Sequence, residues 1–338
     1  MITINKNHQD AIKQVCQAAS SKSHIQALEN VHITASVDGT VKLKAGDSLV
    51  EVTRLVVADS VETGFTTTVN ASKFMQSFNA CNGDVTIIVK DEMTIKSGRR
   101  KFVLDTINPD SYPSYPELTD DQVIDCPNLI ELIKSVSWAA AVDDVRFYLN
   151  GAHIGEYVVS TNGHKMSLVK ANIDTDIIIP VEAVRKLPNL TSYQVSASDN
   201  ILAIKTDDME FKTKLVDGRF PDYKRVIRDV EKRATVNTEE FKNAIKAAAV
   251  LADEKKKTIV FTFGVESKVE SAETSRKESS SIGFDCDTSD DIKFACSSVY
   301  ILELINSVQS ESVTLGFNDN QLIVEDGDQT SIVMGVKV

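Results

Sequence analysis

Apolar residues recur at the spacing of one helical face in three stretches that lie about a third of the chain apart. Each stretch has apolar side chains at positions i, i+3, i+4 and i+7, a pattern that predicts an amphipathic helix. The three sets are Ile12, Val15, Cys16 and Ala19; Leu129, Leu132, Ile133 and Val136; and Phe241, Ala244, Ile245 and Ala248. Similar elements at equal spacing indicate an internal repeat.

A second series of helical patterns follows the first by roughly half a repeat. Its members are Ala71, Phe74, Met75 and Phe78; Val181, Val184 and Leu187; and Ile301, Leu304, Ile305 and Val308. The middle pattern is the weakest of the three, because Pro188 ends it after two turns. The two series together predict two helices in each repeat.

Each helix of the second series is followed by two alternating stretches that read as a β-hairpin. The stretches are DVTIIVKDEMTIK, YQVSASDNILAIK and SVTLGFNDNQLIVE, with turns at Asp91–Glu92, Asp199–Asn200 and Asp319–Asn320. The sequence therefore predicts an α+β fold of three repeated units, each with two helices against antiparallel sheet.

Two proline-containing stretches mark the borders between the repeats. They are LDTINPDSYPSYPEL, which begins at Leu104, and KLVDGRFPDYKRV, at 214–226. Proline disfavours continuation of a helix or a central strand, so both stretches are predicted to be linkers. The predicted domains are residues 1–119, 120–224 and 225–338.

Composition and charge describe an ordinary globular protein with an acidic surface. The 338 residues carry a net charge of −12, which argues against tight binding of nucleic acid over the whole surface but not over one face. No apolar run is long enough to span a membrane, and the N-terminus lacks the pattern of a secretory leader. The five scattered cysteines are expected to be small buried residues in a reducing compartment, so we expect a cytoplasmic protein.

Several motifs resemble one known family. VRFYLNG (145–151), STNGHKMSLVK (160–170) and KLVDGRFPDYKRV, with SGRRKF (97–102) and AAAVLADEK (247–255), resemble the bacterial DNA polymerase III beta subunit, the sliding clamp. The resemblance extends over the whole chain at the expected domain spacing. It implies that the three units form half of a closed ring, completed by a second copy in a head-to-tail homodimer.

The resemblance also implies a function without catalysis, cofactor or metal. The ring would encircle duplex DNA without regard to sequence and act as a processivity factor. It would bind DNA polymerase, the clamp loader and repair proteins through their short linear peptide motifs. A closed ring cannot leave DNA sideways, so weak, salt-sensitive phosphate contacts are sufficient, which agrees with the acidic total charge.

The family's peptide-binding pocket lies between its second and third domains, and its positions can be matched here. They are Leu149, Thr161, Gly163, His164, Lys165, Met166, Pro221, Arg225, Val226, Ile332, Val333, Met334, Gly335, Val336, Lys337 and Val338. Apolar and methionine side chains suit leucine or aromatic anchors of a peptide, and Arg225 and Lys165 are expected to fix its polar groups. Gly335, Lys165 and Asn162 stand where the family commonly has proline, arginine and aspartate, so we expect a different peptide preference. The alternative for the whole set is the core of a domain junction with an ordinary last strand.

Two further sets follow from the resemblance. The DNA-contacting positions are Lys22, Ser72, Asp143, Phe147 and Tyr148, and the dimer-interface positions are Phe102, Val250 and Leu251. Ser72 lacks a cation that is often present in the family, and Asp143 adds a negative charge, so DNA contact is expected to be weak. From the residues alone, Phe147 and Tyr148 fit the core of a strand and Phe102 fits either a core or an outward strand position.

Other features have plainer interpretations. His164 is expected to support a turn, because no ligand or nucleophile spacing surrounds it. The clusters Asp120–Asp121 and Asp285 to Asp291, and the basic run Lys255 to Lys257, are expected to be solvated loops. The serine-rich segment 267–281 predicts an exposed hairpin with a mobile tip.

Two alternative functions remain open at this point. One is an enzyme that uses His164 and Asp217 near the second linker. The other is a three-repeat scaffold that binds peptides without encircling DNA.

Overall fold

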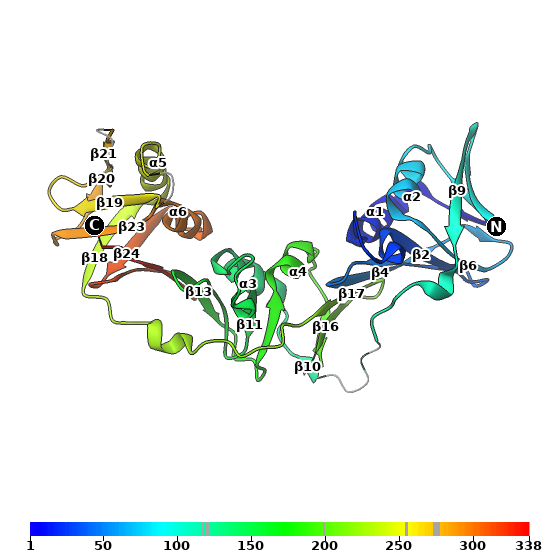
Figure 1. Cartoon of the computed structure of the whole chain (residues 1–338), viewed down its shortest axis with the longest axis horizontal. Coiled ribbons are helices and arrows are strands. Elements are labelled where there is room, and N and C mark those ends of the chain that lie inside the picture. The colour runs from blue at the N-terminus through cyan, green and yellow to red at the C-terminus, as the bar shows by residue number, and fades with distance from the viewer. Residues whose placement is uncertain (117, 119–121, 199, 254–255, 273–277, 338) are drawn as a thin grey trace. The chain divides into compact units, whose positions relative to one another are not determined.

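The structure is a computed structural model that describes residues 1–116, 118, 122–198, 200–253, 256–272 and 278–337 (Figure 1). The chain divides into two compact units. The N-terminal unit comprises Met1–Pro127 and Arg185–Leu215, and the C-terminal unit comprises Asn128–Val184 and Val216–Val338. The second repeat thus contributes to both units.

All six predicted helices are present. They are α1 (Gln9–Ala18), α2 (Ala71–Asn79), α3 (Leu129–Val136), α4 (Val181–Lys186), α5 (Thr238–Ala249) and α6 (Ser298–Ser307). Their apolar stripes supply buried residues on one face of each helix. Asn70 and Asn237 cap α2 and α5 alike: each side chain accepts a hydrogen bond from the backbone N–H three residues later. The predicted stop at Pro188 is also confirmed, since α4 ends two residues before it.

The strands of the N-terminal unit form one antiparallel sheet, in the order β10-β15-β16-β17-β4-β3-β2-β6-β9-β8-β7-β1-β5. They are β1 (Ile2–Ile4), β2 (Asn30–Ala35), β3 (Thr40–Gly46), β4 (Val50–Val57), β5 (Ser60–Val61), β6 (Phe65–Asn70), β7 (Val85–Val89), β8 (Glu92–Ser97), β9 (Arg100–Ile107), β10 (Gln122–Ile124), β15 (Gln194–Ala197), β16 (Ile201–Lys205) and β17 (Met209–Lys214). Helices α1 and α2 pack on each other, α1 against β3 and β4 and α2 against β6. The first repeat therefore has the predicted two helices over antiparallel sheet.

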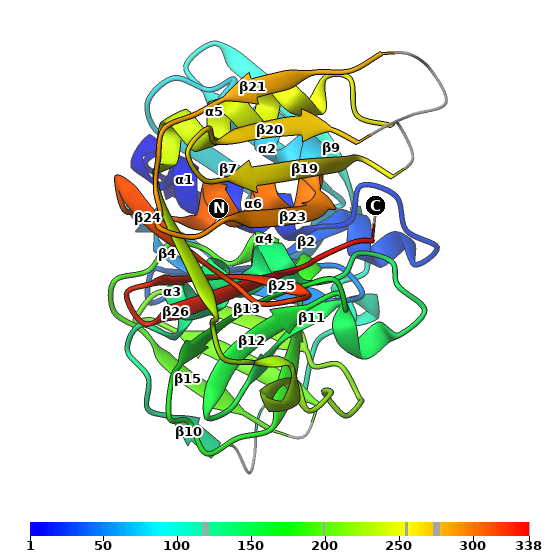
Figure 2. The same ribbon diagram turned by 90° about the vertical axis from the view of Figure 1, so that its left-hand side faces the viewer.

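The C-terminal unit has two antiparallel sheets. The larger has the order β14-β11-β12-β13-β26-β25-β24-β18-β22 and the smaller β21-β20-β19-β23, which Figure 2 shows beside α5 and α6. The strands are β11 (Gly151–Ile154), β12 (Tyr157–Thr161), β13 (Lys165–Lys170), β14 (Ile177–Pro180), β18 (Lys232–Asn237), β19 (Thr258–Phe263), β20 (Lys268–Ser271), β21 (Ser281–Gly283), β22 (Cys286–Asp287), β23 (Ile292–Ser297), β24 (Ser312–Phe317), β25 (Gln321–Asp326) and β26 (Gln329–Met334). Its main core, which includes Phe241, Phe261 and Phe263, lies between these strands and α5 and α6.

Two strand pairings join the second repeat to its neighbours. In the first seam, β17 pairs with β4 from Met209↔Arg54 to Thr213↔Val50. In the second seam, β13 pairs with β26 from Lys165↔Val333 to Val169↔Gln329. Each seam lies within one unit, and each makes a continuous sheet out of strands from two repeats.

The predicted hairpins are confirmed as the pairs β7–β8, β15–β16 and β24–β25, although Asp199 of the second turn lies outside the described residues. The serine-rich hairpin is confirmed by the pairing of β20 with β21, and its predicted mobile tip also lies outside the described residues. The first predicted linker begins inside β9, which ends at Ile107, and the second begins at Lys214, the last residue of β17. The described remainder of each linker is irregular except for one short 3₁₀ helix, η3 (Pro109–Ser111) and η6 (Tyr223–Val226) respectively. The other 3₁₀ helices are η1 (Lys6–His8), η2 (Gln26–Glu29), η4 (Ser137–Ala139) and η5 (Phe147–Leu149).

The alternative in which Phe147 and Tyr148 belong to the core of a strand is wrong. Both lie in η5, where the N–H of Leu149 donates to the carbonyl of Arg146 and that of Asn150 donates to the carbonyl of Phe147. Phe147 is 55% exposed. These N–H and C=O groups are hydrogen-bonded within the 3₁₀ turn, so they cannot pair with a neighbouring strand.

Four of the five cysteines are buried and Cys286 is half-buried, and all five are free thiols. Burial raises the pKa of the Cys16 thiol to about 12, so this residue behaves as a small apolar side chain. Of the helices in the described part of the chain, none is both long and apolar enough to span a membrane.

Candidate functional site

A small pocket lies at the end of the second seam. Its volume is about 50 Å³, and seven of the residues singled out in the sequence line it: Thr161, Gly163, Lys165, Met166, Val226, Ile332 and Met334. Residues that are far apart in the sequence therefore meet where β13 and β26 pair and η6 approaches them. We call this cavity the seam pocket.

One wall of the seam pocket is a tight turn between β12 and β13. The Thr161 hydroxyl donates to the carbonyl of Lys165 at 2.8 Å and accepts from the Gly163 N–H at 3.0 Å. Asn162 Oδ1 accepts from the N–H groups of His164 and Lys165 at 2.8 and 3.0 Å. Gly163 has a φ of +89°, which an L side chain rarely adopts, so this glycine permits the turn.

The opposite wall comes from the last strand and the second linker. Ile332 and Met334 project from the same face of β26, whereas Val333 lies on the other face in the main core of the unit. Gln321 Nε2 donates to the Val226 carbonyl at 2.7 Å and lies 3.7 Å from the Met334 sulfur, so it ties the linker to the strand. The stretch KLVDGRFPDYKRV is thus both a linker and, at Val226, a pocket wall.

The other predicted pocket residues do not line this cavity. Leu149 is buried in η5, His164, Pro221, Arg225 and Lys337 are exposed, and Val338 lies outside the described residues. Arg225 forms an ion pair with Asp222 at 2.7 Å. The N–H of Val336 donates to the Ala295 carbonyl at 2.8 Å, which fixes the segment after β26.

At Gly335, where the resemblance implies a proline, the local structure suits glycine. Its N–H donates to the Asn320 carbonyl at 2.8 Å, a bond that proline cannot make. A Cβ at this position would lie 3.0 Å from the Phe294 ring. Glycine therefore lets the chain pass close to that ring.

The Lys165 side chain bonds to the protein itself, whereas we expected it to fix polar groups of a peptide. Its Nζ donates to Glu303 Oε2 and to the Trp138 carbonyl, both at 2.6 Å, and the side chain is 5% exposed. The ammonium group is already bonded to the protein, and the partners could not be read from the sequence because Glu303 is far along the chain.

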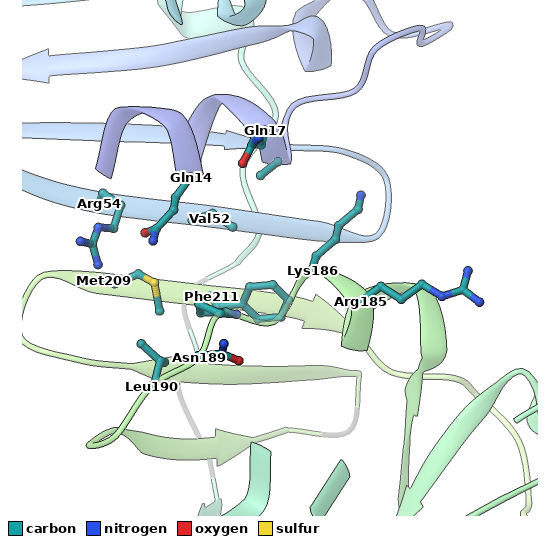
Figure 3. Close-up of a pocket in the computed structure, with 12 residues that line it drawn as sticks. Gln14, Gln17, Val52, Arg54, Arg185, Lys186, Asn189, Leu190, Met209 and Phe211 are labelled. Carbon is teal, nitrogen blue, oxygen red and sulfur yellow. The ribbon is translucent and has the colours of Figure 1, made fainter. Parts of the chain in front are cut away.

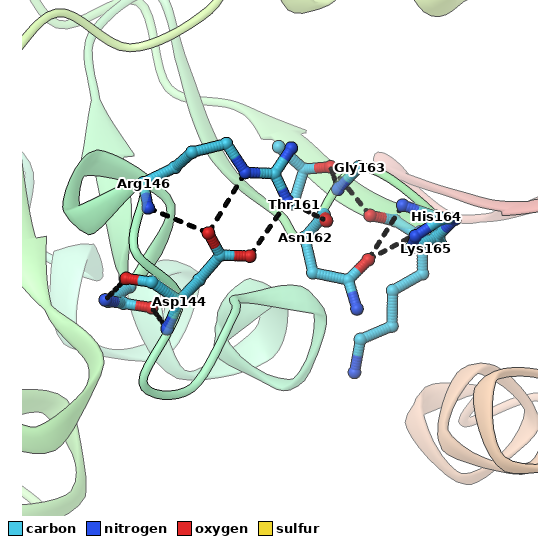
Figure 4. A network of polar contacts seen from close by, with 8 residues as sticks. Asp144, Arg146, Thr161, Asn162, Gly163, His164 and Lys165 are labelled. Atoms are coloured by element: carbon cyan, nitrogen blue, oxygen red, sulfur yellow. Dashed lines mark hydrogen bonds and ion pairs between the residues drawn. The ribbon is translucent and has the colours of Figure 1, made fainter. Parts of the chain in front are cut away.

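A polar network beside the turn was also missed by the sequence analysis (Figure 4). Arg146 Nε and Nη2 donate to the two carboxylate oxygens of Asp144 at 3.0 and 2.8 Å, and Nη2 also donates to the Asn162 carbonyl at 3.3 Å. The hydrogen bond from Arg146 lowers the pKa of Asp144 to about 2. Arg146 is part of the motif VRFYLNG. The presence of Asp144 two residues before it is the sequence feature that could have indicated this ion pair.

His164 does not support its turn through its ring. The turn is held by the side chains of Thr161 and Asn162, and the imidazole stacks on Tyr300 with the ring centroids 6.1 Å apart. His153 lies in the core, stacked on Phe220 and 2.9 Å from Asp176, and burial lowers its pKa. Among the described residues, no group of three or more His, Cys, Asp or Glu side chains is arranged to hold a metal ion.

The predicted DNA-contacting residues are divided between the two units. In the N-terminal unit, Lys22 lies in the exposed loop after α1, and Ser72 lies in the first turn of α2, where it accepts from Gln76 Nε2 at 3.1 Å. In the C-terminal unit, Asp143 is exposed with a φ of +54°, and the Phe147 and Tyr148 rings meet edge to face at 5.9 Å. Tyr148 is half-buried, so Phe147 is the more accessible of the two rings.

Two of the three predicted interface residues are exposed, as residues that contact a partner would be in a single chain. Val250 and Leu251 follow α5 and are 76% and 39% exposed. Phe102 on β9 is half-buried. Lys256 and Lys257 are exposed nearby, as expected for a solvated turn, while Lys255 and the cluster Asp120–Asp121 lie outside the described residues.

A larger cavity, of about 510 Å³, lies at the first seam and holds none of the predicted site residues (Figure 3). Gln14 and Gln17 of α1 stand on one side, and Met209 and Phe211 of β17 lie on the other. Arg54 at its edge forms an ion pair with Asp208 at 3.1 Å. Volume alone does not therefore identify the pocket that the sequence predicted.

Three family models match the chain in order along its length. They describe the N-terminal, central and C-terminal domains of the DNA polymerase III beta subunit and match residues 1–116, 123–222 and 224–334.

Curated relatives and solved structures agree with these models. The chain is 25% identical to the beta sliding clamp of Haemophilus influenzae, over 95% of this chain and 94% of that protein. It is 26% identical to that of Escherichia coli K12, over 97% and 96% of the two chains. A sliding clamp of Pseudomonas aeruginosa, solved with bound griselimycin, has the same fold, with a TM-score of 0.91 at 23% identity over 100% of this chain and 99% of that one. The chain belongs to the DNA polymerase III beta subunit family, whose members are the sliding clamps, non-catalytic processivity factors of DNA replication.

Proposed function

We propose that two copies of this chain associate head to tail into a ring that encircles duplex DNA and tethers a DNA polymerase to it. The observation that carries this proposal is the ordered match of all three clamp domains over residues 1–334. The repeated two-helix units support it, because six similar units can close a ring of even curvature. We further propose the domain limits 1–119, 120–224 and 225–338, and a cytoplasmic location.

DNA is held loosely in this proposal. The contacting residues are Lys22, Ser72, Asp143, Phe147 and Tyr148, of which only Lys22 is a cation. Because each neutralised phosphate adds to affinity and to salt dependence, this set provides a weak contact compatible with sliding. The contacts would be to the sugar–phosphate backbone and independent of sequence.

The seam pocket takes an apolar side chain from a short linear peptide of a polymerase, a clamp loader or a repair protein. Met166, Val226, Ile332 and Met334 offer apolar surface, and two methionines can adapt to differently shaped anchors. The cavity is small, so it suits one side chain, and the rest of the peptide lies on the surface beside it.

The dimer interface is formed by Phe102 of one copy and by Val250 and Leu251 of the other. The exposure of two adjacent large apolar side chains after α5 supports this assignment, since a partner that covered them would remove apolar surface from water.

The proposal is tested by light scattering on the purified chain and on Leu251→Asp. We expect a particle of twice the 37.1 kDa of one chain, and a monomer for the variant, because a carboxylate would be desolvated in an apolar contact. The matched control is Val265→Asp, at a fully exposed position, which should remain dimeric. A monomer for the unaltered chain at all concentrations would favour the scaffold that binds peptides without encircling DNA.

A further inference from the structure

Lys165 connects three elements at the edge of the seam pocket. It is the first residue of β13, Trp138 belongs to η4, and Glu303 lies on α6. The Lys165 ammonium donates to the Trp138 carbonyl and to the Glu303 carboxylate at 2.6 Å each, so a single side chain bridges the second and third repeats.

Two aromatic rings enclose the same ammonium. Nζ lies 5.4 Å from the ring centroids of both Trp138 and Tyr300, within the range of a cation–π interaction. Trp138 itself packs against the core of the third repeat, although its chain segment belongs to the second. The Glu303 side chain is 39% exposed whereas that of Lys165 is 5% exposed, so removal of Glu303 would leave the buried ammonium without its counter-charge at the junction.

Lys165 is the only charged residue among the seven that line the pocket, and its charge is offset by Glu303. We infer that Lys165 is a positioning residue: its ion pair with Glu303 holds β13, η4 and α6 together and thereby fixes the wall of the seam pocket. The inference rests on the proposed peptide-binding function. It replaces a direct role for the ammonium in binding a peptide's polar groups.

The fluorescence of Trp138 can be used to follow the position of the Lys165 ammonium. Trp138 is the single tryptophan of the sequence, and within the described residues its buried Nε1 has no hydrogen-bond partner. A cation beside the indole changes its fluorescence, so the emission of the full chain reports whether the Lys165 ammonium remains in place.

The test compares Glu303→Gln and Lys165→Met with the unaltered chain. Glu303 does not line the pocket, and methionine keeps the apolar stem of Lys165 while it removes the charge. The matched control is Glu239→Gln, which breaks the exposed Lys242–Glu239 pair on α5. The probe is a capped hexapeptide without charged side chains or tryptophan that ends in leucine and phenylalanine, with its affinity measured by calorimetry.

We expect both variants to change the Trp138 emission and to weaken peptide binding by roughly fivefold or more, with the control unaffected. The double variant should bind no worse than either single variant, because both changes remove one interaction. Lys165→Arg should retain most of the affinity, since it keeps the charge.

Two results separate the inference from the function on which it rests. If Glu303→Gln binds the peptide as the unaltered chain does, while its Trp138 emission changes, the ion pair does not position the pocket and the inference is wrong. If the unaltered chain does not bind the peptide, or if Met334→Ala binds it as tightly as the unaltered chain does, the proposed peptide site itself is wrong.

Discussion

The two seams join neighbouring repeats by the same antiparallel pairing, but they place charge differently. In the first seam, Lys212 of β17 lies opposite Glu51 of β4, and both are almost completely buried within the sheet. In the second seam, the central opposite residues are Ser167 and Ser331, with their hydroxyls 3.1 Å apart, and the buried cation Lys165 lies at the end of the strand.

This difference bears on where a binding pocket can form. Buried charges in the middle of the first seam need polar partners, and the cavity beside it has mixed walls, with Arg54 and Lys186 as well as Met209 and Phe211. The second seam has a neutral centre and ends at a turn, so apolar side chains such as Ile332 and Met334 are left to form a small cavity there. The larger cavity is thus not the better candidate for recognition of an apolar anchor.

The largest effect is expected for Lys212→Ala in the first seam. The change would leave Glu51 and Glu210 near each other without the buried ammonium, whose Nζ lies 3.4 Å from Glu210 Oε2. We expect a loss of about 3 kcal/mol in the free energy of unfolding, measured by urea denaturation. Lys42→Ala, at an exposed position in the same sheet, is the control and should change it by less than about 0.5 kcal/mol. Equal effects of the two variants would contradict a buried charge pair at the seam.

In the second seam, Ser167→Ala should have a smaller effect. Ser167 is fully buried, accepts from Gln329 Nε2 at 2.9 Å and pairs with the Ser331 hydroxyl. Its loss leaves two polar groups with fewer partners, so we expect a destabilisation of about 1–2 kcal/mol in the same denaturation assay. Thr314→Ala, which removes the exposed Thr235–Thr314 contact, is the matched control and should be nearly neutral.

Glu51→Gln should alter the pH dependence of stability. Burial raises the pKa of Glu51 above its ordinary value, so the folded state binds this proton more tightly than the unfolded state does. The contribution of Glu51 to stability is therefore fully present below the unfolded pKa and is lost as pH rises through the raised folded pKa. The glutamine variant should gain stability relative to the unaltered chain as pH rises from about 4 to about 8. A difference that stays constant with pH would show that Glu51 does not titrate abnormally.

The smallest effect is expected for Asp208→Ala, also at the first seam. Its ion pair with Arg54 is partly exposed, with side-chain exposures of 17% for Arg54 and 54% for Asp208. Solvent screens such a pair, and we expect a change of about 0.5 kcal/mol or less, which high salt should reduce further. A loss as large as that of Lys212→Ala would mean that exposure does not govern the strength of these pairs.

Local patterns were sufficient to predict the repeats, helices and hairpins. The stripes at Phe241 and Ile301 became α5 and α6 because a helical face that is apolar must be buried. Pairings between repeats were beyond such reasoning, since nothing local distinguishes β13, which pairs with β26, from a strand that pairs within its own repeat.

Seven of the sixteen pocket residues expected from the resemblance line the seam pocket, and the contacts that each residue makes could not be predicted. Family likeness indicated Lys165, but the side chain turns to Glu303 and Trp138, which lie far from it in the sequence. From the residues alone, Phe147 and Tyr148 also fitted the core of a strand, and the 3₁₀ helix η5 excludes that alternative. Tertiary contacts decided the role of Lys165, and local hydrogen bonds of η5 decided the conformation of Phe147 and Tyr148.

Solution X-ray scattering on the purified chain, with mass calibrated by concentration, tests the central claim most directly. The account predicts a particle of twice 37.1 kDa whose distance distribution is that of a hollow ring. A compact or crescent-shaped monomer at every concentration would contradict a chain that closes into a ring by itself.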